Sequence, residues 1–107
     1  MKSQAKVVVI GGGVVGVGTL YHLAKKGWGD EVVLIEKAEL TSGSTWHAAG
    51  LLPLFNMSYS VGQIHKYSVE LYKSLEKETG QPVGFSQVGN LRLAMNDDRM
   101  DEYYQYA

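Results

Sequence analysis

The sequence predicts an α/β fold that begins with two parallel strands joined by a helix. A continuous apolar run over 6–10 is typical of a strand buried on both faces, and a second run over 31–36 predicts another. Between them, a helical pattern over 14–26 is followed by Gly27, and glycine commonly ends helices. A right-handed crossover of this length places the two strands side by side in one sheet.

A glycine-rich turn follows the first strand directly and opens the helix. Gly11, Gly13 and Gly16 have the spacing G-x-G-x-x-G. The first glycine permits a tight turn, the second lets the backbone approach a pyrophosphate, and the third lets helix and strand pack closely. The free N–H groups of the helix N-terminus attract phosphate. The sequence therefore predicts a Rossmann-like unit that holds the ADP half of a dinucleotide.

An acidic residue closes the second strand, twenty residues past the last glycine of the motif. Glu36 at this position can accept hydrogen bonds from the adenosine ribose hydroxyls, and it would repel a 2′-phosphate, which disfavours NADP. The alternative is an ordinary surface acid at a strand end. The neighbouring Lys37 either reaches over the adenine side or is simply solvated.

Length and composition limit the class of protein. The 107 residues have a net charge of −1, which gives no support for nucleic-acid binding. They contain no cysteine, which excludes disulfides within the segment. No apolar stretch is long enough to span a membrane, and no histidine and acid pair has metal-ligand spacing, so no metal is assigned. The first strand starts too early to leave room for a targeting peptide, so we expect a cytoplasmic protein.

The rest of the chain departs from the repeating strand–helix pattern. A polar loop leads to a short helix that Ser44 or Thr45 could cap. A long helix is expected over 60–79, then two short strands over 84–87 and 90–95, and a further helix from 101. We therefore expect residues 1–107 to be the N-terminal portion of a dinucleotide-binding domain, incomplete in this chain, with an ADP-binding βαβ unit (5–36), a cofactor-contacting loop (37–58), and a helix with the start of further strands (59–107).

His47 lies among small residues, which let the backbone come close to a ligand. The N–H groups of these residues could hold a second phosphate of that ligand. By itself, a partly exposed histidine at a helix start would be the simpler interpretation.

Three segments carry a resemblance to a known family. The strand with its glycine turn (8–16), the end of the second strand (34–37) and the string Gly-Ser-Thr-Trp-His-Ala-Ala-Gly (43–50) resemble the dimethylglycine/sarcosine dehydrogenase branch of the FAD-dependent amine oxidoreductases. The similarity continues through 72–85 and 89–94. It implies a D-amino-acid-oxidase-like FAD-binding domain, and the 51–57 segment is where the chain departs from the family pattern.

The resemblance implies that His47 carries FAD covalently through the 8α carbon of the isoalloxazine ring. It implies oxidation of an N-methyl amine such as dimethylglycine or sarcosine by hydride transfer to the flavin. Oxygen or an electron-transfer flavoprotein would accept the electrons, and tetrahydrofolate would be a further ligand of a longer protein. No catalytic residue is assigned within these residues, which alone would be inactive. The implied FAD contacts are Gly11, Gly13, Val15, Gly16, Glu36, Lys37, Gly43, Ser44, Thr45, Trp46, His47, Ala48, Ala49, Gly50 and Leu51.

Two other interpretations stay open. One is a non-catalytic regulatory relative of the same fold, which the resemblance implies would lack the Trp46-His47 pair. The other is an NAD-dependent dehydrogenase, which explains 11–36 but gives no role to 43–50.

Overall fold

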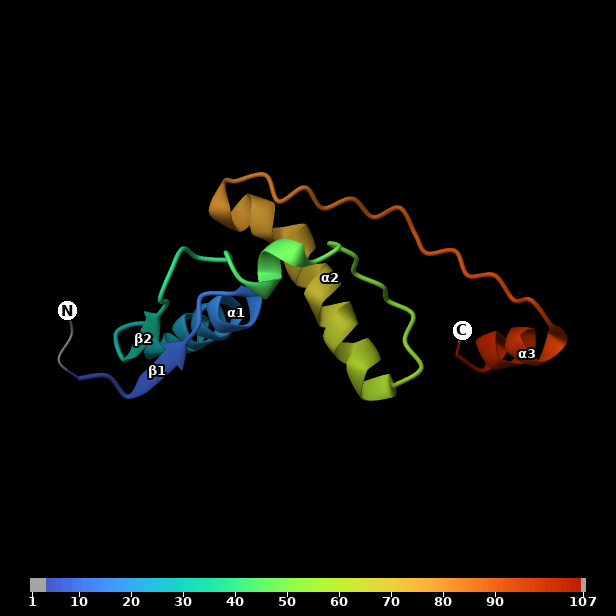
Figure 1. The fold of residues 1–107 in the computed structure, drawn as a ribbon, viewed down its shortest axis with the longest axis horizontal. Coiled ribbons are helices and arrows are strands. Elements are labelled where there is room, and N and C mark those ends of the chain that lie inside the picture. Colours follow the sequence, from blue (N-terminus) through green and yellow to red (C-terminus); the bar gives the residue numbers. More distant parts are fainter. Residues whose placement is uncertain (1–3, 107) are drawn as a thin grey trace. The chain divides into compact units, whose positions relative to one another are not determined.

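The computed structural model describes residues 4–106 and divides the chain into two compact units, Met1–Gly50 and Leu51–Ala107. In the first unit, strand β1 (Val7–Ile10) leads into helix α1 (Val14–Leu23) and then strand β2 (Val32–Ile35). The strands pair in parallel, with Val7 opposite Val32 and Ile10 opposite Ile35 (Figure 1). The predicted strand–helix–strand unit is confirmed.

The helical segment that begins with α1 ends at the predicted glycine, but its last turn is not α-helical. Its α-helical part stops at Leu23, and one turn of π-helix, η1 (Ala24–Trp28), continues it. Gly27 within this turn has a φ of 88°, in the left-handed region that glycine enters without steric cost. The predicted stop at Gly27 is therefore correct.

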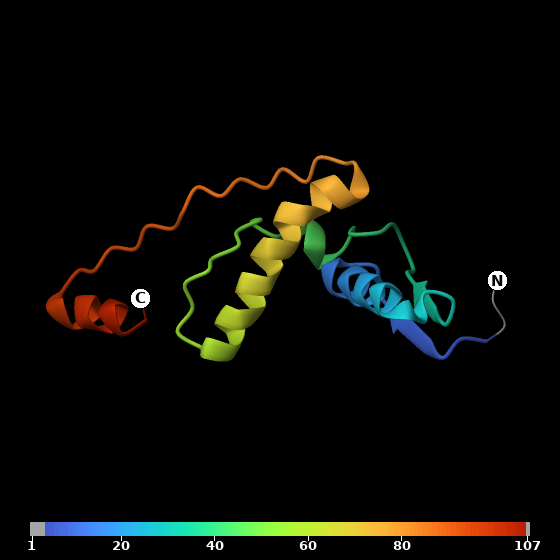
Figure 2. The ribbon, with the colours of Figure 1, turned by 180° about the vertical axis from the view of Figure 1, so that it is seen from behind.

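The sheet of the first unit is covered on one face only. Exposure alternates along β1, where Val8 and Ile10 are 50% and 85% exposed, and in β2 only Val32 is fully buried. Helix α1 packs against both strands and covers one face, as Figure 2 shows from behind. The expectation that both faces are buried is wrong for the described part of this unit, because none of its elements packs on the second face.

The second unit is built around helix α2 (Tyr59–Thr79), which begins one residue before the predicted start. Gly80 ends it with a φ of 70°, and its N–H donates to the carbonyl of Glu76, as expected for a helix C-terminus. Val69, at 3% exposed, is the buried residue of this helix.

The two strands predicted over 84–87 and 90–95 do not form among the described residues. The chain runs extended between α2 and the last helix, without strand pairing (Figure 1). Alternating apolar residues favour a strand, but a strand forms only where another strand supplies its hydrogen bonds. Their side chains stay exposed as a result, Val88 and Leu91 at 87% each.

Helix α3 (Asp97–Tyr106) begins four residues before the predicted helix at 101. Its start follows a cap, since the Asn96 side chain accepts the Arg99 N–H at 2.9 Å. Asp97 and Asp98 then lie in the first turn, where negative charge is favourable. Tyr103 packs edge-on against Phe55, with ring centroids 5.7 Å apart.

The close packing of α1 on the end of β1 predicts that a methyl group added at Gly16 destabilises the fold. A Cβ on Gly16 would lie 1.9 Å from the Gly11 carbonyl oxygen, so helix and strand must separate. We expect Gly16→Ala to lower the free energy of unfolding by about 1–3 kcal/mol, measured by urea denaturation of the whole apoprotein.

Gly18→Ala is the matched control for this substitution. It adds the same group to the same helix, where a Cβ meets nothing within 4 Å. We expect it to raise stability by up to about 1 kcal/mol, because alanine favours helix more than glycine does. If Gly16→Ala is as stable as wild type, the close contact is not a constraint.

Candidate functional site

The glycine turn connects β1 to α1 and brings three backbone segments close together. Gly11 has a φ of 104°, which favours glycine, and its N–H donates to the Ile35 carbonyl at 2.8 Å. Gly16 lies against Gly11, as the sequence predicts for the third glycine of the motif. Helix α1 is thereby held with its N-terminus at the turn, where first-turn N–H groups have no partner inside the helix.

Glu36 lies at this turn, as its position after β2 predicts. Its side chain accepts hydrogen bonds from the Gly12 N–H at 2.6 Å and from the Ala38 N–H at 2.9 Å. These bonds favour the ionised form, so the Gly12 N–H first and the Ala38 N–H second hold the pKa of the Glu36 carboxyl below its ordinary value of 4.5. Glu36 is therefore a structural partner of the glycine turn, a role that strand-end position alone does not indicate.

Gly12, which the motif leaves unassigned, is a contact point of the site. It is buried, its N–H bonds Glu36, and its carbonyl accepts the Thr41 N–H at 2.9 Å. A Cβ on Gly12 would lie 2.5 Å from Leu40 Cδ2. The only sequence signal for this role is the middle position in a run of three glycines.

The loop after β2 therefore folds back over the glycine turn. Thr41 has a φ of 67°, which is unusual for a β-branched residue. Its N–H donates to the carbonyl of Gly12, and this bond holds the loop on the turn.

A short 3-10 helix, η2 (Ser44–His47), follows the loop. Gly43 is its N-cap and no side chain caps it, so the expected cap by Ser44 or Thr45 is wrong. The Thr45 hydroxyl instead accepts the Val14 N–H of α1 at 2.8 Å. The cap is wrong because a hydroxyl accepts equally well from its own turn or from a distant one, and local sequence does not distinguish them.

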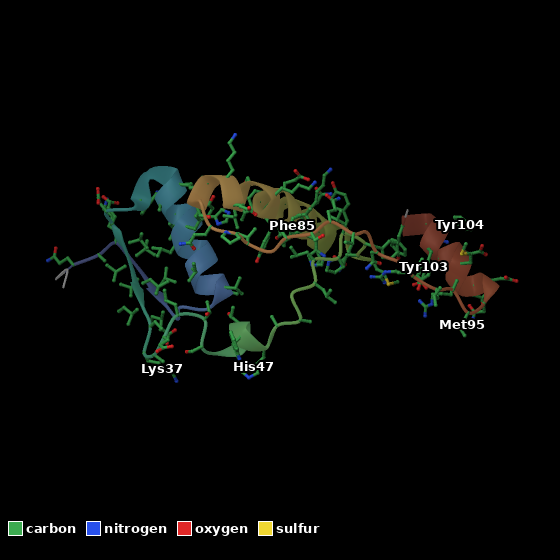
Figure 3. All side chains as sticks on the ribbon, turned by 90° about the horizontal axis from the view of Figure 1, so that it is seen from above. Lys37, His47, Phe85, Met95, Tyr103 and Tyr104 are labelled. Atoms are coloured by element: carbon green, nitrogen blue, oxygen red, sulfur yellow. The ribbon has the colours of Figure 1, made fainter. Side chains whose placement is uncertain are left out.

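His47 is the last residue of η2 and is exposed. Its Nδ1 lies 3.2 Å from the Gly43 carbonyl oxygen, so the tautomer with the proton on Nδ1 donates to that oxygen. Trp46 beside it is 79% exposed. Figure 3 shows the His47 and Lys37 side chains extending outward from the ribbon.

The structure brings together part of the predicted site. Close contacts and hydrogen bonds within the first unit join five of the predicted residues: Gly11, Gly13, Gly16, Glu36 and Thr45. Leu51 belongs to the second unit. The other predicted cofactor contacts with exposed side chains are Val15, Lys37, Ser44, Trp46, His47, Ala48 and Ala49. Across residues 4–106, no group of His, Cys, Asp and Glu residues could hold a metal ion.

A family model described as "FAD dependent oxidoreductase" matches residues 6–107. The chain belongs to this family. Its first unit is thus the start of a Rossmann-like FAD-binding domain. The chain is 56% identical over 102 residues to "Dimethylglycine dehydrogenase, mitochondrial" of Rattus norvegicus, which covers 95% of this chain and 12% of that protein.

Two further relatives carry different names. "Sarcosine dehydrogenase, mitochondrial" of Mus musculus is 46% identical over 104 residues, or 96% of this chain and 11% of that protein. "Pyruvate dehydrogenase phosphatase regulatory subunit, mitochondrial" of Mus musculus is 41% identical over 100 residues, or 94% and 11%. The chain thus spans a small part of each relative's length.

No helix between residues 4 and 106 has the length and apolar character needed to cross a bilayer. The cytoplasmic location expected from the sequence stays a prediction, and the mammalian relatives named above are called mitochondrial.

The bonds to Glu36 predict a pH-dependent contribution to stability. A carboxyl whose pKa is lowered by folding stabilises the protein above its ordinary pKa and loses that effect as pH falls through the folded value. We expect the difference in Tm between wild type and Glu36→Gln to be largest above pH 4.5 and to decline in more acid solution.

Thermal unfolding of the apoprotein over a pH series measures this difference. Glu39→Gln removes one negative charge from the same loop and controls for the change in net charge. A Tm difference between wild type and Glu36→Gln that stays constant through the acid range would contradict the role of the carboxylate.

Proposed function

We propose that the protein is an FAD-dependent oxidoreductase that oxidises an N-methyl amine such as dimethylglycine or sarcosine, with FAD linked covalently to His47. The observation that carries the proposal is the bond between Val14 and Thr45. It joins the turn suited to a pyrophosphate to the short helix that bears the only histidine in the 43–50 string.

The residues present fit an FAD molecule. A Cβ on Gly11 would meet nothing within 4 Å, so the start of the turn offers open backbone to a diphosphate, and the α1 N-terminus supplies N–H donors and partial positive charge. We assign the adenosine ribose to Glu36, whose oxygens each accept one backbone N–H and have remaining lone pairs for ribose hydroxyls. Its negative charge repels a 2′-phosphate, which favours FAD over NADP.

The contact between His47 and Gly43 suits a covalent link. In the tautomer that carries the proton on Nδ1, this nitrogen donates to the Gly43 carbonyl, which orients the imidazole, and Nε2 has a free lone pair. His47 would hold the flavin through a bond from Nε2 to the 8α carbon, and dioxygen would take up the two electrons and two protons that this bond formation releases, giving hydrogen peroxide. We assign the remaining 43–50 residues to contact with the same cofactor, except Thr45, whose hydroxyl accepts the Val14 N–H.

Bound FAD would supply the redox chemistry by accepting a hydride from the methyl carbon of the amine, whose iminium product then takes up water or tetrahydrofolate. The turn and the 43–50 string would bind and orient the cofactor. The names of the relatives, dimethylglycine dehydrogenase and sarcosine dehydrogenase, support this substrate class. The electron acceptor, oxygen or an electron-transfer flavoprotein, and a folate site are further predictions.

A non-catalytic role is the second candidate, because a phosphatase regulatory subunit shares 41% identity with the chain. The higher identity to dimethylglycine dehydrogenase favours the enzyme. An NAD-dependent dehydrogenase is disfavoured, because the FAD family model extends well past the ADP-binding turn, through 37–107.

Covalent flavin tests the proposal directly. We expect acid-precipitated whole protein to retain yellow colour and flavin fluorescence, at about one flavin per chain by the proposed single linkage. His47→Ala is expected to lose all covalent flavin, because the proposed linkage is made by His47 alone.

His22→Gln is the control, since it removes a histidine of the same unit whose Nδ1 contacts the Gly18 carbonyl within α1. It should retain covalent flavin. Covalent flavin in His47→Ala would exclude this attachment site, and wild type without any flavin would favour the regulatory candidate.

A further inference from the structure

We infer that Thr45 is a positioning residue for flavin attachment, which holds the helix bearing His47 against the N-terminus of α1. This inference rests on the proposed function and concerns the attachment step. Thr45 lies two residues before His47, in the same single turn of 3-10 helix. Its hydroxyl bonds an N–H at the α1 N-terminus, thirty-one residues earlier in the chain.

Two contacts of the Thr45 hydroxyl oxygen place this residue at the turn. Its Oγ1 is 2.8 Å from the Val14 nitrogen, a normal hydrogen-bond distance. The same oxygen would lie 2.9 Å from a Cβ on Gly13, so the absent side chain of that glycine leaves the space that the hydroxyl fills. The contact therefore depends on both the hydroxyl of Thr45 and the glycine beside it.

Among the described residues, the other hydrogen bonds of η2 stay within residues 43–48, so the bond from Thr45 is the one that ties η2 to α1. No side chain caps it, Gly43 precedes it, and the chain leaves it extended at Ala48. The 3-10 helix is one turn long, and so short a helix has little stability of its own. The Gly43 carbonyl orients the His47 ring within η2, and the bond from Thr45 restrains where η2 lies relative to the diphosphate turn.

The same bond occupies a backbone donor at the α1 N-terminus, the Val14 N–H. Val14 N–H is one of the first-turn groups that would otherwise be available to an anion. Because the Thr45 hydroxyl accepts it, we assign the diphosphate to the later first-turn N–H groups and Thr45 to the fixing of η2. Loss of the hydroxyl should then affect the attachment rate more than the affinity for FAD.

Thr45→Val tests this separation, because valine keeps the branched shape and removes the hydroxyl. Whole apoprotein from riboflavin-limited cells is mixed with FAD. Noncovalent affinity is taken from fluorescence quenching at early times, and the attachment rate from acid-stable flavin at saturating FAD. We expect the rate to fall roughly tenfold or more, with the affinity within about threefold of wild type.

Thr45→Ser should restore most of the rate, since it keeps the accepting oxygen. Thr19→Val is the matched control: it is the same substitution in the same unit, at a hydroxyl that donates to the Val15 carbonyl within α1. It should attach flavin at the wild-type rate. If Thr45→Val does not fold, Thr45→Ala replaces it, with the same expected loss of rate and the same rescue by serine.

The outcomes distinguish this inference from the proposed function. Wild type without covalent flavin overturns the proposed function and the inference with it. Covalent flavin in wild type, with an unchanged attachment rate in Thr45→Val, overturns the inference alone. A weaker affinity with an unchanged rate at saturation also overturns it, because Thr45 would then be a cofactor ligand.

Discussion

The close approach of helix α1 to the end of β1 is the constraint on which the rest of the first unit depends. Gly16 packs against the Gly11 carbonyl at a distance that admits no side chain. This contact holds the N-terminus of α1 at the turn, where the N–H groups of the helix would bind a diphosphate. Glu36 and Thr45 both reach backbone N–H groups of this same turn, so their positions depend on that packing.

Hydrogen bonds at the turn come from residues far along the chain. Gly12 N–H meets a carboxylate at the end of β2, and Val14 N–H meets a hydroxyl beyond the following loop. Each bond satisfies a donor that lacks a partner inside the helix or strand. The turn is therefore assembled by three separate segments. A change in any of them alters the surface offered to a cofactor.

Periodicity and glycine spacing are enough to predict β1, the turn, α1 and β2, because these depend on local patterns that recur in βαβ units, and helical spacing alone predicts α2. The hydrogen bond between Val14 and Thr45 is not predictable from the sequence, since it spans thirty-one residues and a local partner for the hydroxyl is equally plausible. The segment over 84–95 shows the same limit. Its alternation is typical of a strand, but pairing depends on a partner that sequence pattern does not supply. The start of α3 was missed although Asn96, an ordinary capping residue, marks it.

Thr41 has a consequence for engineering. A β-branched residue at a φ of 67° carries a backbone cost of about 1–2 kcal/mol that glycine would avoid, and asparagine would reduce. The side chain of Thr41 is exposed, and only its main chain contacts the glycine turn. Replacement by asparagine therefore offers a route to a more heat-tolerant protein that leaves the contacts of the turn intact.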